Sequence, residues 1–198
     1  MHFSTRNPIF VILAVYLPNP VHLRAQLASI APQSYPAQKV VAVIADTTSD
    51  QLVAEICAHH GLDLATVVPA EQTESVQSFE LGLRRALEIA PENALFALCD
   101  QDDVWAVDKL KRTAAALVVP DVAMVHSDAE VVDAGGQRLH HSMHHLERRK
   151  RSPSIRDLLL KNTVTGMTTL TTRAVVQAAL PFPKQSALYF HHDLWLAL

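Results

Sequence analysis

The chain has 198 residues, 49% of them hydrophobic and 19% charged, and its formal net charge at pH 7 is −3. This length fits one domain with a substantial core, and the composition is that of an ordinary globular protein. The small negative charge gives no general attraction to nucleic acid, so we expect no nucleic-acid partner.

Glycine, cysteine and the apolar segments exclude further classes of protein. The five glycines are Gly61, Gly82, Gly135, Gly136 and Gly166. They form neither a G-x-G-x-x-G turn nor a phosphate loop, which disfavours Rossmann-type dehydrogenases and P-loop kinases. Cys57 and Cys99 stand far apart without zinc-ligand spacing, which favours two reduced thiols in a cytoplasmic protein. The apolar segment Ile9–Leu17 is too short to span a bilayer, and we expect no transmembrane segment.

Strands and helices alternate over the first two thirds of the chain. Short, branched, apolar runs predict strands at Ile9–Tyr16, Lys39–Ala45, Ala65–Val68, Ala94–Cys99 and Val122–His126. Apolar residues at helical spacing predict helices at Val21–Ile30, Gln51–His60, Thr73–Ala90 and Trp105–Leu117. This alternation favours an α/β fold with a mostly parallel central sheet.

Three carboxylates, Asp100, Asp102 and Asp103, follow the predicted strand Ala94–Cys99 within four positions. Open α/β sheets bind their ligands at the carboxyl ends of the strands. Because clustered acids repel one another, we expect a cation to hold them together. Mg²⁺ or Mn²⁺ suits such oxygen ligands and also binds substrate phosphates. The alternative is that the acids cap a helix beginning near Val104, with Asp103 the best candidate for the cap.

The last third of the chain is less regular. A hairpin-like turn is predicted at 133–136, helices at Ile155–Lys161 and Arg173–Leu180, and a strand at Thr163–Thr172. Gly166 within that strand suggests a close approach of its backbone to substrate or to another strand. His191-His192-Asp193 directly precedes a final apolar helix, inside which the chain stops. We therefore expect one domain over residues 1–198, shortened at its C-terminus.

Two clusters of basic or imidazole side chains lie between these elements. His140, His141, His144 and His145 have spacings that would suit a transition metal on a helix, but a solvated loop is favoured because no carboxylate or thiolate accompanies them. The run Arg148–Arg151 is expected to be solvated, with a peripheral contact to anionic lipid headgroups as the alternative.

Several motifs, in order and at similar spacing, resemble those of the family 2 glycosyltransferases with the GT-A fold, and especially their bacterial rhamnosyltransferase-like branch. The matching segments are Leu27–Ile30 with Gln33–Pro36 ("L-x-S-I…Q-x-Y-P"), Asp100–Trp105 with Lys109-Leu110 ("DQDDxW…KL"), Ser127–Ala129 ("SDA"), Asn162–Gly166 ("N-x-x-x-G"), and Pro181–Pro183 with His192–Ala197 ("PFP…HDxWLA"). The resemblance covers nearly the whole chain.

The resemblance implies a nucleoside-diphosphate-sugar donor and assigns roles to five residues. Tyr16 matches the tyrosine that stacks on the pyrimidine base, and Asp46 matches the acid that hydrogen-bonds that base. Asp100 and Asp102 match the acidic motif, with Asp102 the better metal ligand and Asp100 near the ribose or the ion. Asp193 matches the catalytic base of inverting members.

Two segments depart from the family pattern. The usual Thr-Tyr-Asn-Gly is Val15-Tyr16-Leu17-Pro18, and the usual Asp-Asp-Gly-Ser is Ala45-Asp46-Thr47-Thr48. Both differences fall in the nucleotide pocket, so the identity of the donor stays open. The residues alone also fit simpler roles: Tyr16 as a core aromatic, Asp46 as the start of an Asx turn, and Asp193 as the N-cap of its helix.

The functional expectation is an inverting glycosyltransferase with Mg²⁺ or Mn²⁺ as cofactor, Asp193 as general base, and rhamnose as one candidate sugar. Its acceptor would be a hydroxyl of a saccharide or lipid-linked saccharide, in polysaccharide or O-antigen synthesis at the cytoplasmic face of the membrane. The alternative is a degenerate GT-A module that binds a nucleotide or a partner without turnover. A phosphotransferase with an Asp-x-Asp nucleophile is disfavoured because such a pair follows the first strand, whereas Asp100 and Asp102 come far down this chain.

Overall fold

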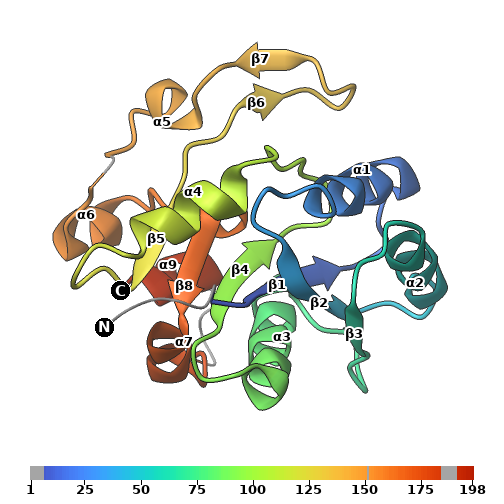
Figure 1. The fold of residues 1–198 in the computed structure, drawn as a ribbon. Coiled ribbons are helices and arrows are strands. Elements are labelled where there is room, and N and C mark those ends of the chain that lie inside the picture. The colour runs from blue at the N-terminus through green and yellow to red at the C-terminus, as the bar shows by residue number, and fades with distance from the viewer. Residues whose placement is uncertain (1–6, 151, 184–190) are drawn as a thin grey trace.

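The computed structural model describes residues 7–150, 152–183 and 191–198, and their central feature is a six-stranded sheet in the order β3-β2-β1-β4-β8-β5 (Figure 1). Its strands are β1 (Ile9–Val15), β2 (Ala37–Ile44), β3 (Leu64–Val67), β4 (Leu95–Cys99), β5 (Met124–His126) and β8 (Thr169–Thr172). The first four strands are parallel, and β8 runs antiparallel between β4 and β5. The predicted α/β fold with a mostly parallel sheet is confirmed.

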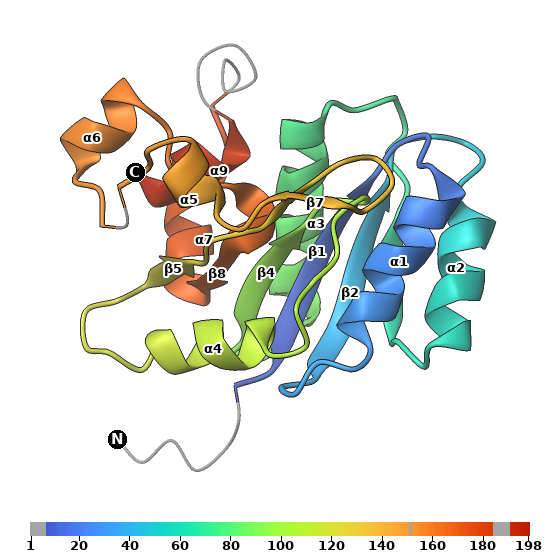
Figure 2. The same ribbon diagram turned by 90° about the horizontal axis from the view of Figure 1, so that it is seen from above.

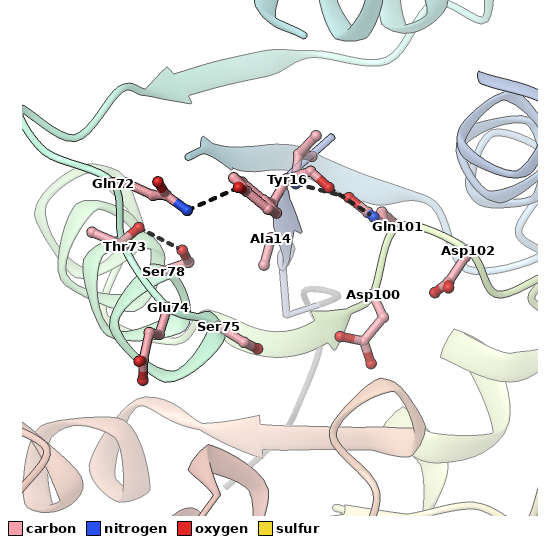
Figure 3. A pocket seen from close by; sticks show the side chains of 11 residues that line it. Ala14, Tyr16, Gln72, Thr73, Glu74, Ser75, Ser78, Asp100, Gln101 and Asp102 are labelled. Carbon is pink, nitrogen blue, oxygen red and sulfur yellow. Dashed lines mark hydrogen bonds between the residues drawn. The ribbon is translucent and has the colours of Figure 1, made fainter. Parts of the chain in front are cut away.

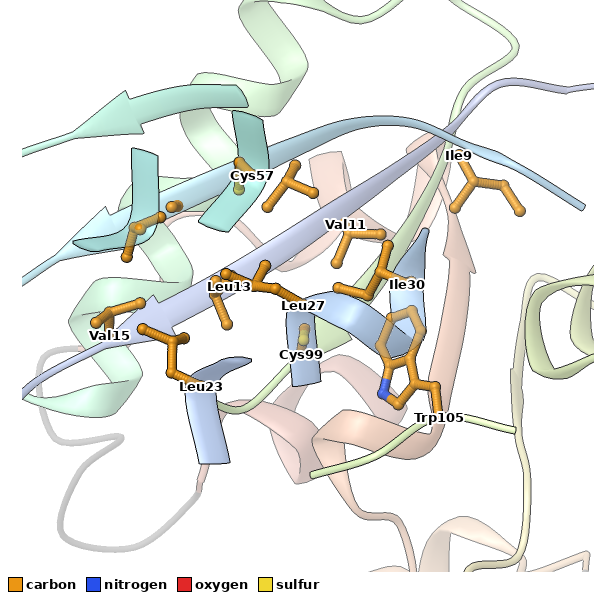
Figure 4. Close-up of a cluster of buried hydrophobic side chains, with 14 of the residues drawn as sticks. Ile9, Val11, Leu13, Val15, Leu23, Leu27, Ile30, Cys57, Cys99 and Trp105 are labelled. Atoms are coloured by element: carbon orange, nitrogen blue, oxygen red, sulfur yellow. The ribbon is translucent and has the colours of Figure 1, made fainter. Parts of the chain in front are cut away.

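Helices cover both faces of the sheet (Figure 2). One face carries α1 (Pro20–Ile30), α2 (Asp50–His59) and α4 (Lys109–Ala116), and the other carries α3 (Ser75–Ile89), α7 (Arg173–Ala179) and α9 (His192–Ala197). Successive side chains of a strand point to opposite faces, so β1 supplies both layers of the core. Ile9, Val11 and Leu13 pack beneath α1 and α2 (Figure 4), whereas Phe10 and Ile12 pack beneath α3.

The helix α4 begins at Lys109, four residues later than the predicted Trp105. Trp105 is instead buried in the core, and its backbone N–H donates to Ser29 Oγ at 2.9 Å. Gln33 donates to the Ala106 carbonyl at 2.8 Å and accepts from the Leu110 N–H at 3.1 Å. These contacts satisfy backbone groups of the segment before α4 and one free N–H of the first turn of α4. The prediction that Asp103 caps a helix beginning near Val104 is therefore wrong.

The threonine-rich segment Thr163–Thr172 is only partly a strand. Its last four residues form β8, and Gly166–Thr168 forms the 3-10 turn η1. The hydroxyls of Thr168 and Thr169 donate to the carbonyls of Thr165 and Gly166 at 2.6 and 2.8 Å. Such side-chain bonds to the local backbone compete with strand pairing, which explains the shorter strand.

A two-stranded hairpin, β6 (Val131–Val132) and β7 (Arg138–His140), turns at the predicted 133–136 and leads into α5 (Met143–Leu146) and then α6 (Ile155–Leu160). The histidines after this turn do not form a solvated loop throughout. His144 is buried, and its ring centroid lies 5.3 Å from that of His126. Within the described residues, no group of three His, Cys, Asp or Glu side chains is arranged to hold a metal ion.

Two further expectations concern thiols and the membrane. Cys57 and Cys99 are both free and buried. Among the helices that the structure describes, none has the length and apolar character needed to cross a bilayer.

Candidate functional site

The carboxyl ends of β1 and β4 border a pocket of about 500 Å³ (Figure 3). Because β1 pairs in parallel with both β2 and β4, the residues that follow these strands lie at one edge of the sheet. The pocket is lined by Ala14, Val15, Tyr16, Gln72, Thr73, Glu74, Ser75, Ser78, Asp100, Gln101 and Asp102. The structure thus brings Tyr16, Asp100 and Asp102 together, whereas Asp46 and Asp193 do not line this pocket.

Tyr16 lies at the pocket with 45% of its surface exposed, so it is not an aromatic of the core. Its hydroxyl accepts a hydrogen bond from Gln72 Nε2 at 2.8 Å. Gln101 holds the tyrosine backbone from both sides: Tyr16 N donates to Gln101 Oε1 at 2.8 Å, and Gln101 Nε2 donates to Tyr16 O at 3.1 Å (Figure 3). The residue between the two motif acids therefore holds the backbone that carries the exposed ring.

Asp46 pins the turn that follows β1. Its Oδ2 accepts from the Leu17 N–H at 2.9 Å, and its Oδ1 accepts from the N–H groups of Thr48 and Ser49, both at 2.8 Å. Burial raises its pKa, but these hydrogen bonds outweigh that effect and lower the pKa to about 2. Leu17 has a φ of 41°, an uncommon conformation for a residue with a side chain, which the Asp46 carboxylate helps to hold. Asp46 does begin an Asx turn.

The acidic residues after β4 form a site with excess negative charge. Burial, followed by repulsion from Asp103, Asp102 and Asp193, raises the pKa of Asp100 to about 7. Burial and Asp102 likewise raise the pKa of Asp103 to about 6, against the opposing effect of Lys109. Carboxylates that are difficult to ionise in the absence of a cation are enriched at functional sites. Oxygen donors of this kind fit Mg²⁺ or Mn²⁺, which use one or two carboxylates together with substrate phosphates.

A buried cation lies below these acids. Lys109 Nζ sits 3.8 Å from the centroid of the Trp105 ring, and the residue is 9% exposed. Burial lowers the pKa of Lys109 to about 8, and the neighbouring Cys99 and Asp103 act in the opposite direction. No sequence pattern predicts that this lysine lies in the core, since lysine is rarely buried without a partner.

Asp193 is the second residue of α9, and His191 occupies the N-cap position, so the predicted cap role of Asp193 is wrong. Its carboxylate accepts from Asn162 Nδ2 at 3.0 Å and from the Gly166 N–H at 3.2 Å. Asp193 also contributes to the raised pKa of Asp100, which places it within electrostatic reach of the acidic motif. Neither Asn162 nor Gln101 was assigned a role from the sequence.

The sequence profile of the family described as "Glycosyltransferase like family 2" matches residues 7–198. This chain belongs to that family. No curated protein matches the chain at a significant level.

Solved structures share the fold of this family 2 chain. A mannosyltransferase from Pyrobaculum calidifontis, in complex with GDP-Man and Mn²⁺, superimposes with a TM-score of 0.70 at 20% identity, covering 98% of this chain and 52% of that one. S. aureus TarS 1–349 in complex with UDP gives a TM-score of 0.62 at 18% identity, covering 96% of this chain and 54% of that one. The same TarS fragment in complex with UDP-GlcNAc gives a TM-score of 0.62 at 18% identity, covering 86% of this chain and 47% of that one. The chain spans about half the length of these structures. The predicted family is confirmed, and the rhamnosyltransferase-like branch stays a prediction.

Proposed function

We propose that this chain is an inverting glycosyltransferase domain, which transfers a sugar from a nucleoside-diphosphate-sugar to a hydroxyl of a saccharide or lipid-linked saccharide. The observation that supports it most is one pocket that joins an exposed aromatic, Tyr16, to the carboxylates of Asp100 and Asp102. An aromatic face suits a nucleotide base, and paired carboxylates suit a metal-bound diphosphate. We further propose that the sugar is rhamnose and that the transfer belongs to polysaccharide or O-antigen synthesis at the cytoplasmic face of the membrane.

Asp102, with Asp100 beside it, would hold Mg²⁺ or Mn²⁺, and the mannosyltransferase with the same fold was solved with Mn²⁺. When bound, such an ion stabilises the negative charge that develops on the departing diphosphate. Asp193 accepts the proton of the acceptor hydroxyl as that oxygen attacks the anomeric carbon. One displacement inverts the anomeric centre, so no covalent intermediate on the protein is needed.

The decisive experiment is a thermal-shift screen of UDP-, GDP- and dTDP-sugars with and without Mn²⁺, since a ligand that binds only the folded chain raises its melting temperature. We expect a metal-dependent shift for the true donor. In the Asp102→Ala variant, we expect the donor affinity measured with Mn²⁺ to fall to the value measured without it. Equal donor affinity with and without Mn²⁺ in the wild type would remove the metal from the proposal.

The second candidate is a degenerate module that binds a nucleotide without turnover. The observation that favours it is Asp46, whose two carboxylate oxygens already accept hydrogen bonds from Leu17, Thr48 and Ser49. A nucleotide base would have to share an acceptor that the chain itself uses. Donor binding in the screen, combined with no release of nucleotide under turnover conditions, would select this candidate.

Gln101 offers a test of the proposed base platform. In a Gln101→Ala variant, both hydrogen bonds to the Tyr16 backbone are lost, and we expect UDP or GDP to bind about tenfold more weakly, since a hydrogen bond contributes about 0.5–1.5 kcal/mol. Calorimetry without metal isolates this effect from the diphosphate site. Gln51→Ala is the matched control, because Gln51 is exposed on α2 and donates to Glu55 of the same helix at 2.8 Å. Unchanged nucleotide affinity in Gln101→Ala would contradict the platform.

A peripheral membrane contact is part of the proposal, and α5 and α6 supply its surface. Large apolar side chains are exposed there: Leu146, Ile155, Leu159 and Leu160. Arg148 and Arg156 are exposed beside them. Exposed leucines among cations are the composition that binds anionic lipid surfaces.

We expect the chain to sediment with vesicles of phosphatidylcholine and phosphatidylglycerol but not with phosphatidylcholine alone. Leu160→Asp should weaken this binding by about tenfold or more, because one leucine buried in the interface is worth about 1.5–3 kcal/mol. Val119→Asp is the control, since Val119 is an exposed apolar residue outside this surface. Equal binding of Leu160→Asp and the wild type would reject the surface.

A further inference from the structure

We propose that Asn162 is a positioning residue for the transfer step, which fixes the Asp193 carboxylate together with the backbone N–H of Gly166. The inference rests on the proposed role of Asp193 as the base and adds the device that orients it. We call Asn162, Gly166 and Asp193 the carboxylate clamp.

The contacts of the clamp define one orientation of each side chain. Asn162 Nδ2 donates to Asp193 Oδ1 at 3.0 Å, and the Gly166 N–H donates to Asp193 Oδ2 at 3.2 Å. Asn162 Oδ1 accepts from the Val164 N–H at 2.9 Å, so the amide oxygen is committed to the backbone and the amide nitrogen must face the carboxylate. Both oxygens of Asp193 are thus held by the loop that begins at Asn162.

The clamp fixes the carboxylate and still leaves it able to take a proton. Each carboxylate oxygen has two acceptor positions. Oδ1 uses both, for Asn162 Nδ2 and for the Leu194 N–H at 2.6 Å, whereas Oδ2 accepts only from the Gly166 N–H and keeps one position free for a proton. A base that is already held in its reactive orientation does not lose conformational entropy when the reaction begins. Small misplacements of reacting groups lower rates strongly.

The neighbouring His192 holds the first turn of α9 from the other side. Its ring is buried and stacks on Phe79 of α3, with 4.0 Å between the ring centroids. A Cβ atom at Gly166 would lie only 2.6 Å from His192 Nε2, so a glycine is required where the loop passes the ring. Gly166 therefore has two roles: its N–H donates to Asp193, and its lack of a side chain leaves space for the His192 ring.

Burial keeps His192 uncharged. It lowers the pKa of this histidine to about 4, although Asp193 acts in the opposite direction. Within the described residues, neither ring nitrogen has a hydrogen-bond partner. The ring therefore packs against Phe79 as a neutral imidazole.

The test replaces the amide by a carboxylate of nearly the same shape. Asn162→Asp retains an acceptor for the Val164 N–H but places a second anion against Asp193, whereas Asn162→Ala removes both contacts. We expect nucleotide release from the sugar donor identified among GDP-mannose, UDP-GlcNAc and dTDP-rhamnose to fall about 100-fold in kcat for Asn162→Asp, within the range known for general-base catalysis. The donor Kd measured by calorimetry with Mn²⁺ should change by less than about twofold.

The matched control is Asn93→Asp, which makes the same chemical change at an exposed residue. Asn93 precedes β4 and so lies at the amino ends of the parallel strands, opposite the carboxyl ends that border the pocket. A kcat for Asn162→Asp within about threefold of the wild type, or a parallel loss of donor affinity, would overturn the clamp. A wild type that neither binds nor turns over any of the three donors would overturn the proposed function instead.

Melting temperatures test the Asn162–Asp193 contact without an activity assay. Asn162→Ala and Asp193→Asn should each lower the melting temperature, and the double variant should melt close to the less stable single variant, because both changes break one interaction. Additive losses would show that the two side chains act independently, and would overturn the clamp even in a working enzyme.

Discussion

The Asp193→Asn variant should bind the donor as the wild type does and transfer its sugar about 10²–10⁴-fold more slowly, the range typical of general-base catalysis. Asparagine has the shape of aspartate but cannot accept the proton of the acceptor hydroxyl. The acidic residues that line the pocket stay in place, so the metal-dependent affinity for the donor should change by less than about twofold.

The measurement separates kcat from the donor Kd, with nucleotide release followed at saturating donor and binding followed by calorimetry. Asp63→Asn is the control, because Asp63 is exposed, pairs with Lys39 at 2.6 Å and lies before β3, away from the pocket. Transfer at nearly the wild-type rate would reject Asp193 as the base. Loss of donor binding would place Asp193 in the donor site instead.

The strands and most helices of this fold follow from local sequence patterns. Continuous apolar runs such as Ile9–Val15 become strands buried on both faces, because helices cover both sides of the sheet. The carboxyl ends of adjacent parallel strands then meet at one edge. The positions of Tyr16, Asp46 and Asp100 relative to the sheet could therefore be expected from the order of the strands alone.

The errors occur where distant side chains decide the local structure. The helix after the acidic motif starts late because Ser29 and Gln33, more than 70 positions away in sequence, bond the backbone around Trp105. Local capping preferences cannot reveal such partners. Tertiary contacts routinely override them.

The same limit applies to the carboxylate clamp and to Gly166. Asn162 and Asp193 are 31 positions apart, and only the packing of α9 against the rest of the fold brings them together. The sequence indicated that Gly166 allows a close approach, but the group that approaches is the His192 ring and not a second strand. A single sequence identifies residues that can do chemistry at strand ends, whereas the residues that orient them depend on long-range packing.

The largest stability effect is expected from Asp100→Asn, which should raise the free energy of unfolding of the metal-free chain by about 2–4 kcal/mol at about pH 8. Burial and the neighbouring acids raise the pKa of Asp100 from 3.8 to about 7. Because the folded chain binds this proton more tightly than the unfolded chain does, ionisation destabilises the fold. The penalty is absent below about pH 4, grows as the pH rises towards 7, and is complete above it.

Urea unfolding at about pH 4 and pH 8 measures this difference directly. Asp108→Asn is the control: Asp108 lies close by in sequence, its side chain is about half exposed, and it forms a 3.9 Å ion pair with Arg112. Mn²⁺ should stabilise the wild type more than Asp100→Asn at the higher pH, since a cation relieves the repulsion that the substitution has already removed. If Asp100→Asn is no more stable than the wild type at pH 8, the acidic cluster is not held under electrostatic strain. If Asp100→Asn is more stable but no longer binds the donor, the wild-type chain keeps an unfavourable charge because the diphosphate site requires it.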